Sequence, residues 1–113
     1  MSVALDAVSV DAFSPSNVAN LTSGDWTVGG GTNRAVIGFM AAAAGSPAIH
    51  NEMRWRGATG ESLTQISTTL SIGAVSRLSA WGRVAPTSAL GAAYGAWAAA
   101  QDETAIAMLS FTG

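Results

Sequence analysis

Apolar and polar residues alternate in short runs along this chain, and Gly, Pro, Asn and Ser residues separate the runs. Alternation with a period of two is typical of a β-strand with one face on a core. Turn residues at such regular intervals favour an antiparallel β-sandwich over a helical bundle. The pattern predicts an all-β chain of about eight strands. They cover residues 3–10, 18–28, 34–43, 49–56, a short segment through Leu63 and Ile66, 75–85, 88–101 and 104–111.

Two predicted strands show the alternation most clearly, so each is expected to have one face on the core and one face in solvent. In residues 49–56 the core face would hold Ile49, Met53 and Trp55, and the solvent face His50, Glu52, Arg54 and Arg56. In residues 75–85 the core face would hold Leu78, Ala80 and Val84, and the solvent face Arg77, Ser79, Trp81 and Arg83.

Two other predicted strands depart from simple alternation. Residues 34–43 are apolar on both faces, with Val36 and Met40 on one side and Ile37 and Phe39 on the other, so this strand is expected to be central or to lie at a subunit interface. In residues 88–101 the alanines and the apolar spacing also suit a helix, but Gly91 and Gly95 argue against one. We therefore expect a strand there.

The composition of the chain limits the number of domains and the classes of function that we expect. The 113 residues leave room for one domain, residues 1–113, and they include no Cys, no Lys, one His and only 11% charged residues. A net charge of −2 offers no attraction for nucleic acid, and no uninterrupted apolar run is long enough for a transmembrane helix. The start of the chain does not resemble a signal peptide, so we expect synthesis in the cytoplasm without contact with a membrane.

Catalytic chemistry has few candidates. His50 is the one side chain that titrates near neutrality, and its place in the alternation predicts a solvent-facing residue. No serine lies in a Gly-x-Ser-x-Gly motif, although a Ser-His-Asp arrangement that forms only in space stays open. The acidic residues are dispersed, and residues 29–31 are interpreted as a glycine turn. We expect no enzyme activity, no metal and no cofactor.

The basic residues suggest a contact surface. All five are Arg, and four of them lie on the predicted solvent faces of two strands, with Trp81 between Arg77 and Arg83. The candidate partner contacts are Arg54, Arg56, Arg77, Trp81 and Arg83. Arg and Trp together are typical of interface hot spots. Two alternatives stay open: the arginines could pair with Glu52 and Glu61 and keep a face soluble, or Trp81 could stack on a sugar.

The chain also has more apolar surface than one small core can hide. Residues 41–44 and 92–100 are rich in Ala, and the strand at 34–43 is apolar on both faces. Contact between subunits would bury this excess, so we expect a homo-oligomer, with a trimer as one candidate.

Several segments in order resemble a known domain. They are VALDAVS at 3–9, WTV at 26–28, NRAVIG at 33–38, MRWRG at 53–57, LT at 63–64, LSAW at 78–81, VAP at 84–86 and MLSFTG at 108–113. In this order they are similar to a β-sandwich, jelly-roll-like domain of phage virion proteins and bacterial surface proteins. The resemblance implies recognition or assembly and not catalysis. Family members usually continue past the last motif, which implies that a sheet lacks a strand or that a neighbouring subunit supplies it.

The expectation that follows is a non-enzymatic bacteriophage virion structural protein, a capsid decoration or cement protein or a similar minor component. Its partners would be capsid shell subunits and further copies of itself, and its location the virion after synthesis in the host cytoplasm. The alternative is a carbohydrate- or surface-ligand-binding module, in which Trp55, Trp81 or Trp97 would stack on sugar rings. A small hydrolase is a third possibility.

Overall fold

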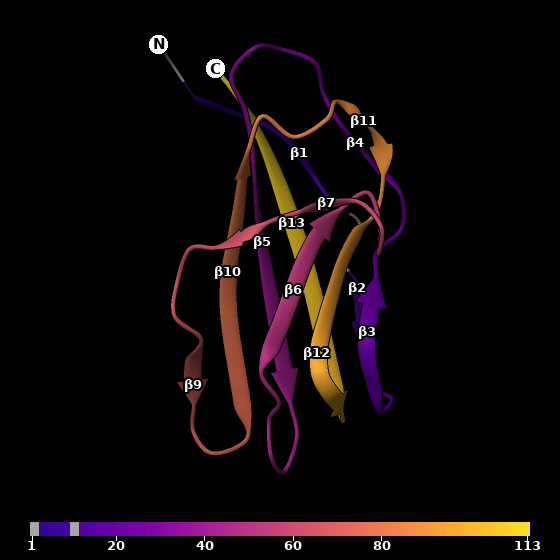
Figure 1. Cartoon of the computed structure of the whole chain (residues 1–113), viewed down its shortest axis with the longest axis vertical. Coiled ribbons are helices and arrows are strands. Elements are labelled where there is room, and N and C mark those ends of the chain that lie inside the picture. The colour runs from indigo at the N-terminus through magenta and orange to yellow at the C-terminus, as the bar shows by residue number, and fades with distance from the viewer. Residues whose placement is uncertain (1–2, 10–11) are drawn as a thin grey trace.

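The computed structural model of the chain describes residues 3–9 and 12–113 (Figure 1). These residues form strands, turns and loops, and none of their segments is a helix that could cross a membrane. The strands are β1 (Ala4–Val8), β2 (Ala12–Ser14), β3 (Val18–Thr22), β4 (Trp26–Val28), β5 (Arg34–Ala43), β6 (His50–Trp55), β7 (Glu61–Ser62), β8 (Thr64–Gln65), β9 (Leu70–Ile72), β10 (Ser76–Val84), β11 (Ala89–Gly91), β12 (Ala93–Gln101) and β13 (Glu103–Thr112). The predicted all-β class is confirmed.

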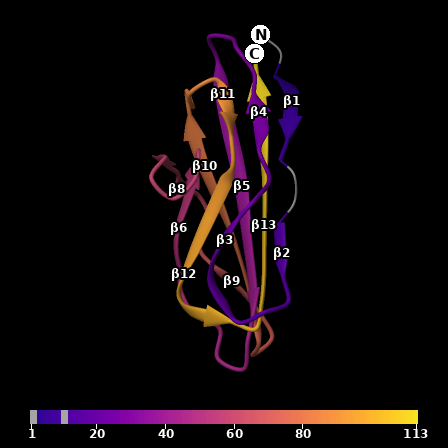
Figure 2. The same ribbon diagram turned by 90° about the vertical axis from the view of Figure 1, so that its right-hand side faces the viewer.

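The strands form two antiparallel layers. In the large sheet the order is β1-β13-β5-β10-β8, with β2 also beside β13 and β9 beside β10. In the small sheet the order is β3-β12-β6-β7, and β11 pairs with β4 in a short ribbon. Figure 2 separates β6 and β12 from β13, β1 and β2. Each sheet interleaves strands from the beginning, middle and end of the chain, which is the double Greek-key connectivity of a jelly roll.

The described residues contain 13 strands and not eight. Three predicted strands are each split in two, giving β3 and β4, β7 and β8, and β11 and β12, and the pattern did not predict β2 and β9. Splitting occurs where the chain passes from one sheet or ribbon to another, so β3 pairs with β12 while β4 pairs with β11. The strand at 34–43 has the predicted bounds and the predicted central position, between β13 and β10.

The core lies between the inner faces of the two sheets. Its buried apolar side chains are Trp26, Val28, Val36, Met40, Ala42, Met53, Trp55, Leu63, Trp81, Ala93, Trp97, Ile106 and Met108. Gly38 and Gly95 let the layers approach closely. A Cβ at Gly38 would overlap the Met53 sulfur, and one at Gly95 would lie 2.9 Å from Ile106 Cγ2. The sheets are therefore packed together as in a sandwich.

The predicted orientation of residues 75–85 is wrong. Ser79 and Trp81 are buried, 1% and 6% exposed, while Leu78 and Ala80 lie on the opposite side of β10 and Val84 is 80% exposed. Both sides of β10 carry apolar residues, so the alternation did not distinguish them. Trp81 belongs to the core.

The predicted orientation of residues 49–56 is wrong at its start. His50 is 3% exposed and Ile49 is 65% exposed, the reverse of the expectation. The cause is a bulge. Trp97 pairs with His50 and Ala96 pairs with Glu52, so Asn51 has no residue opposite it and the alternation shifts by one position.

Candidate functional site

The outward side of the large sheet, which faces away from the core, is apolar. On β5, residues 36, 38, 40 and 42 point into the core, so residues 35, 37, 39, 41 and 43 point away from it. Each outward residue of β5 is paired with a residue of β13 and a residue of β10 that also face outward. Phe39 lies opposite Ala107 of β13 and Ala80 of β10, and Ala41 lies opposite Ala105 and Leu78.

We call this side the outer apolar face. It consists of Ala35, Ile37, Phe39, Ala41, Ala43, Leu78, Ala80, Gly82, Val84, Ala105, Ala107, Leu109 and Phe111, with Leu5, Val8, Phe13, Leu70 and Ile72 on the edge strands. Phe13 is 63% exposed and Phe39 39%. Scattered exposed apolar residues are ordinary in monomers, but a continuous apolar face across a whole sheet marks an interaction surface.

Charge is almost absent from the outer apolar face. Among the described residues whose side chains point outward from β5, β10 and β13, only Glu103 is charged, and it lies at the end of β13 opposite Ala43. Ser76 of β10 and Thr64 of β8 add neutral polar groups at the margins. Burying an apolar surface of this kind against another molecule is favourable in free energy, because few charged groups lose their hydration.

The outer apolar face is not flat, because it contains two shallow hollows. Phe39 stands beside an open hollow that is also lined by Phe13, Ala41, Ala105 and Ala107. A second hollow continues past Ala41 to Leu78 and Ile72. Because alanine side chains are short, the surface of the sheet is low between the two phenylalanines and the leucine, which leaves an open apolar depression there.

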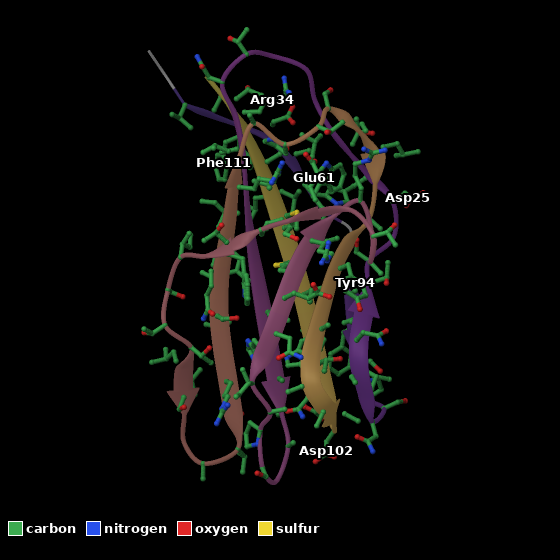
Figure 3. The ribbon with its side chains drawn as sticks, viewed as in Figure 1. Asp25, Arg34, Glu61, Tyr94, Asp102 and Phe111 are labelled. Carbon is green, nitrogen blue, oxygen red and sulfur yellow. The ribbon has the colours of Figure 1, made fainter. Side chains whose placement is uncertain are left out.

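The outward side of the small sheet is polar. Arg54 of β6 donates from Nε to Glu52 Oε2 at 2.8 Å and from Nη1 to the Gly60 carbonyl oxygen. Tyr94 of β12 lies opposite Arg54 and Thr22, and Figure 3 shows it on the small sheet. The two outward sides of the sandwich therefore differ in kind, and only the small sheet presents an ordinary solvated surface.

The five predicted contact residues do not form one surface. Arg54 points outward from the small sheet, Arg56 follows it with a φ of 72° and is exposed, and Arg77 and Arg83 lie near opposite ends of β10. Trp81 is buried between the sheets and cannot contact a partner. For the four arginines the contact role stays a prediction.

Two of these arginines pair with carboxylates as the alternative interpretation expected. Arg54 pairs with Glu52, and Arg83 Nη2 lies 3.0 Å from Glu61 Oε1. Burial opposes ionisation of Glu61, but the Thr87 backbone N–H and Arg83 outweigh it and lower the pKa of this carboxyl. Partly exposed pairs of this kind contribute little stability, so they mainly fix side-chain positions.

Within the described part of the chain, His50 and Ser79 form an arrangement that resembles a catalytic pair. His50 Nδ1 lies 2.6 Å from Ser79 Oγ, and Ser79 Oγ also accepts a hydrogen bond from Trp81 Nε1 at 2.8 Å. Burial, with a smaller effect of Arg77, lowers the pKa of His50 to about 4. Since His50 and Ser79 are almost fully buried, a substrate could reach the hydroxyl only if the sheets separated. The pair serves the core.

Two other classes of site gain no support. All four tryptophans are buried, between 0% and 6% exposed, so none offers a surface for sugar stacking. No group of three His, Asp or Glu side chains converges within residues 3–9 and 12–113 in a way that could hold a metal ion. The outer apolar face is therefore the candidate functional site.

Sequence reasoning found only part of this face. Residues 34–43 are apolar on both sides, and Leu109 and Phe111 give the same signal on the neighbouring strand. Residues 75–85 do not indicate the outer apolar face, because the pattern predicts that their polar side, and not their apolar side, faces solvent.

Comparison with protein-family models, with curated proteins and with solved structures finds no match to this chain.

Proposed function

We propose that this protein is a non-enzymatic structural component of a bacteriophage virion, a capsid decoration or cement protein or a similar minor component. The outer apolar face carries this proposal, because a small sandwich with an apolar sheet surface of very low charge needs another protein to cover it. The ordered resemblance of segments from 3–9 to 108–113 to jelly-roll domains of virion proteins supports the assignment to a virion. Its partners are capsid shell subunits and further copies of itself.

The mechanism is burial of surface. Contact with other chains removes the outer apolar face from water, and separation of the subunits would expose it again at a cost in free energy. Arg54 and Arg56 lie away from this face, on and beside the small sheet, where they would contact the shell. Arg is suited to that role because its guanidinium can pair with two carboxylate oxygens at once.

Co-sedimentation tests the proposal. The purified chain is mixed with shells of the phage that encodes it, assembled without the protein, and the mixture is centrifuged. We expect the chain to pellet with the shells and to raise their melting temperature. The double variant R54A/R56A should pellet less, while T22A, on the same side of the sandwich, should bind as the unmodified chain does.

Failure of the unmodified chain to pellet with these shells would overturn the virion proposal. A glycan array distinguishes the alternative class: a cement protein gives no signal, whereas specific glycan binding would assign the protein to the carbohydrate-binding modules.

A further inference from the structure

We infer that the outer apolar face binds a second copy of this chain, so that two large sheets pack face to face around a two-fold axis. The inference deepens the proposed function and rests on the part of it that makes this face a protein contact. It adds the occupant, the symmetry and the residues at the centre. The three observations that favour a second copy are area, shape and charge.

The area matches what a dimer needs. β5 and β13 have ten residues each, and β10 has nine. At about 3.4 Å per residue and about 4.8 Å between strands, these three strands cover roughly 470 Å². The shorter strands β1, β2, β8 and β9 extend the sheet surface to roughly 700 Å². Stable complexes bury about 800 Å² on each partner, so one copy of this face is close to the size of half an interface.

The shape is self-complementary. A two-fold interface brings the same patch of both subunits together, so each projection must meet a depression on that same patch. Phe39 is the projection, and the hollow beside it is lined by Ala41, Ala105 and Ala107. A two-fold axis that lies between the sheets and crosses the strands between Phe39 and Ala41 places Phe39 of each copy over Ala41 of the other, and it overlaps residues 37–43 of the two β5 strands. The two sheets would then lie about 10 Å apart, as in sandwich cores.

The charges also permit self-association. Identical charged patches repel one another, but this face presents only the Glu103 carboxylate among its described outward residues on the long strands. Glu103 lies at the end of β13, so the axis described above places the two carboxylates near opposite ends of the interface. There water screens them. The polar sides of both small sheets, with Arg54 and Glu52, would face outward.

The first test is the mass of the full chain in solution. By sedimentation equilibrium at micromolar concentration, we expect the mass of two chains. The F39R variant should sediment as a monomer, because it would bury a guanidinium against apolar residues. The matched control T22R, on an exposed position of the small sheet, should remain a dimer. A monomeric unmodified chain, a trimer, or a dimer that survives F39R would overturn the inference.

The second test does not depend on the folding of F39R. The chain has no cysteine, so a single introduced cysteine reports its own surroundings. We expect L70C, at the exposed margin of the face opposite Leu78, treated with a bis-maleimide whose spacer spans about 10 Å, to give a covalent dimer, while T22C stays a single chain under the same conditions. Equal cross-linking of both variants, or none of L70C, would contradict the face-to-face arrangement.

These outcomes are separate from those of the proposed function. Dimerisation is measured on the purified chain without shells, so dimers that do not pellet with shells would remove the virion proposal alone. A monomer that pellets with shells would remove the second copy and leave the shell as the partner of the outer apolar face.

Discussion

One buried hydroxyl connects polar side chains of the two sheets. Ser79 lies on β10 of the large sheet, and His50 lies on β6 of the small sheet. Because the pKa of His50 is about 4, its ring is neutral at pH 7, and the Ser79 hydroxyl can donate to Nδ1 while it accepts from Trp81. A polar pair in this position orients the sheets as well as joining them.

We expect S79A to destabilise the fold. The substitution leaves His50 Nδ1 and Trp81 Nε1 buried without this partner, at a cost of about 1–3 kcal/mol for each group. Urea denaturation would measure the free energy of unfolding. S71A, at an exposed position on β9, is the control and should change this free energy little. An S79A chain as stable as the unmodified one would show that the hydroxyl is dispensable.

The neutral state of His50 also predicts a pH dependence. In the unfolded chain its pKa is about 6.5, and in the folded chain about 4. Between these values the unfolded state binds more protons, so stability is complete above about pH 6.5 and falls as the pH is lowered toward 4. We expect the free energy of unfolding to drop between pH 7 and pH 5, and the drop to be smaller in H50Q. Identical pH profiles for both chains would exclude His50 as the cause.

At the scale of elements, one carboxylate fixes the first strand. Asp6 Oδ2 accepts hydrogen bonds from the Gly29 backbone N–H and from Ser110 Oγ, both at 2.7 Å. Asp6 lies where the pairing of β1 with β13 shifts register, so it holds the strand at its irregular point. The Ser110 hydroxyl and the Gly29 N–H lower the pKa of Asp6.

We expect D6A to loosen β1. Without the carboxylate the shifted register loses its side-chain support, and the Ser9 amide that donates to the Met108 carbonyl should exchange faster in hydrogen–deuterium exchange. D6N, which keeps an acceptor oxygen, should exchange at an intermediate rate. The β12 amides serve as the internal reference, because β12 belongs to the other sheet. Unchanged exchange in D6A would contradict this role.

The turn between β6 and β7 depends on one glycine. Gly60 donates to the Gly57 carbonyl, and a Cβ at Gly60 would overlap the Trp55 carbonyl oxygen and lie 2.7 Å from the Arg56 carbonyl carbon. Because these atoms are backbone, we expect G60A to lower the free energy of unfolding by about 1–3 kcal/mol. G45A is the control, since a Cβ at Gly45 has open space. Thermal melts of both variants would show whether only G60A lowers the Tm.

The sequence predicted the elements better than their orientation. Residues 34–43 could be bounded because Asn33 and Gly45 stand on either side of a continuous apolar run. The side of β10 that faces the core could not be chosen, because Trp81 and Leu78 compete for it and the apolar outward side of this sheet removes the usual polar signal. The bulge at Asn51 could not be predicted from the sequence, because it depends on how β6 pairs with β12. The outer apolar face required the register of three strands, which no single segment contains.

At the scale of the whole molecule, the two sides of the sandwich have opposite characters. The small sheet presents Arg54, Glu52 and Tyr94, and the large sheet presents alanines, leucines and phenylalanines. Figure 1 shows the small sheet in front of the long strands of the large one. A chain with this asymmetry has one side suited to water and one side suited to protein, so its stability should depend on association.

We expect the Tm of the unmodified chain to rise with protein concentration, because dilution would dissociate the proposed dimer and remove the stabilisation that it supplies. Differential scanning calorimetry over a hundredfold concentration range would measure the shift. F39R should melt at one temperature throughout, whereas T22R should follow the unmodified chain. A concentration-independent Tm for the unmodified chain would speak against association through this face.

The segment from β7 to β8 changes sheets within a single residue. Leu63 separates them, and its amide donates to the Met53 carbonyl of the small sheet, while the Ile66 amide donates to the Ala80 carbonyl of the large sheet. The same short stretch is thus anchored to both layers, with the Leu63 side chain buried between them. Along this flank, backbone hydrogen bonds from one short segment hold the two sheets together. A mechanical load that pulls the two layers apart should therefore meet its resistance on this flank, where the chain is held to both sheets.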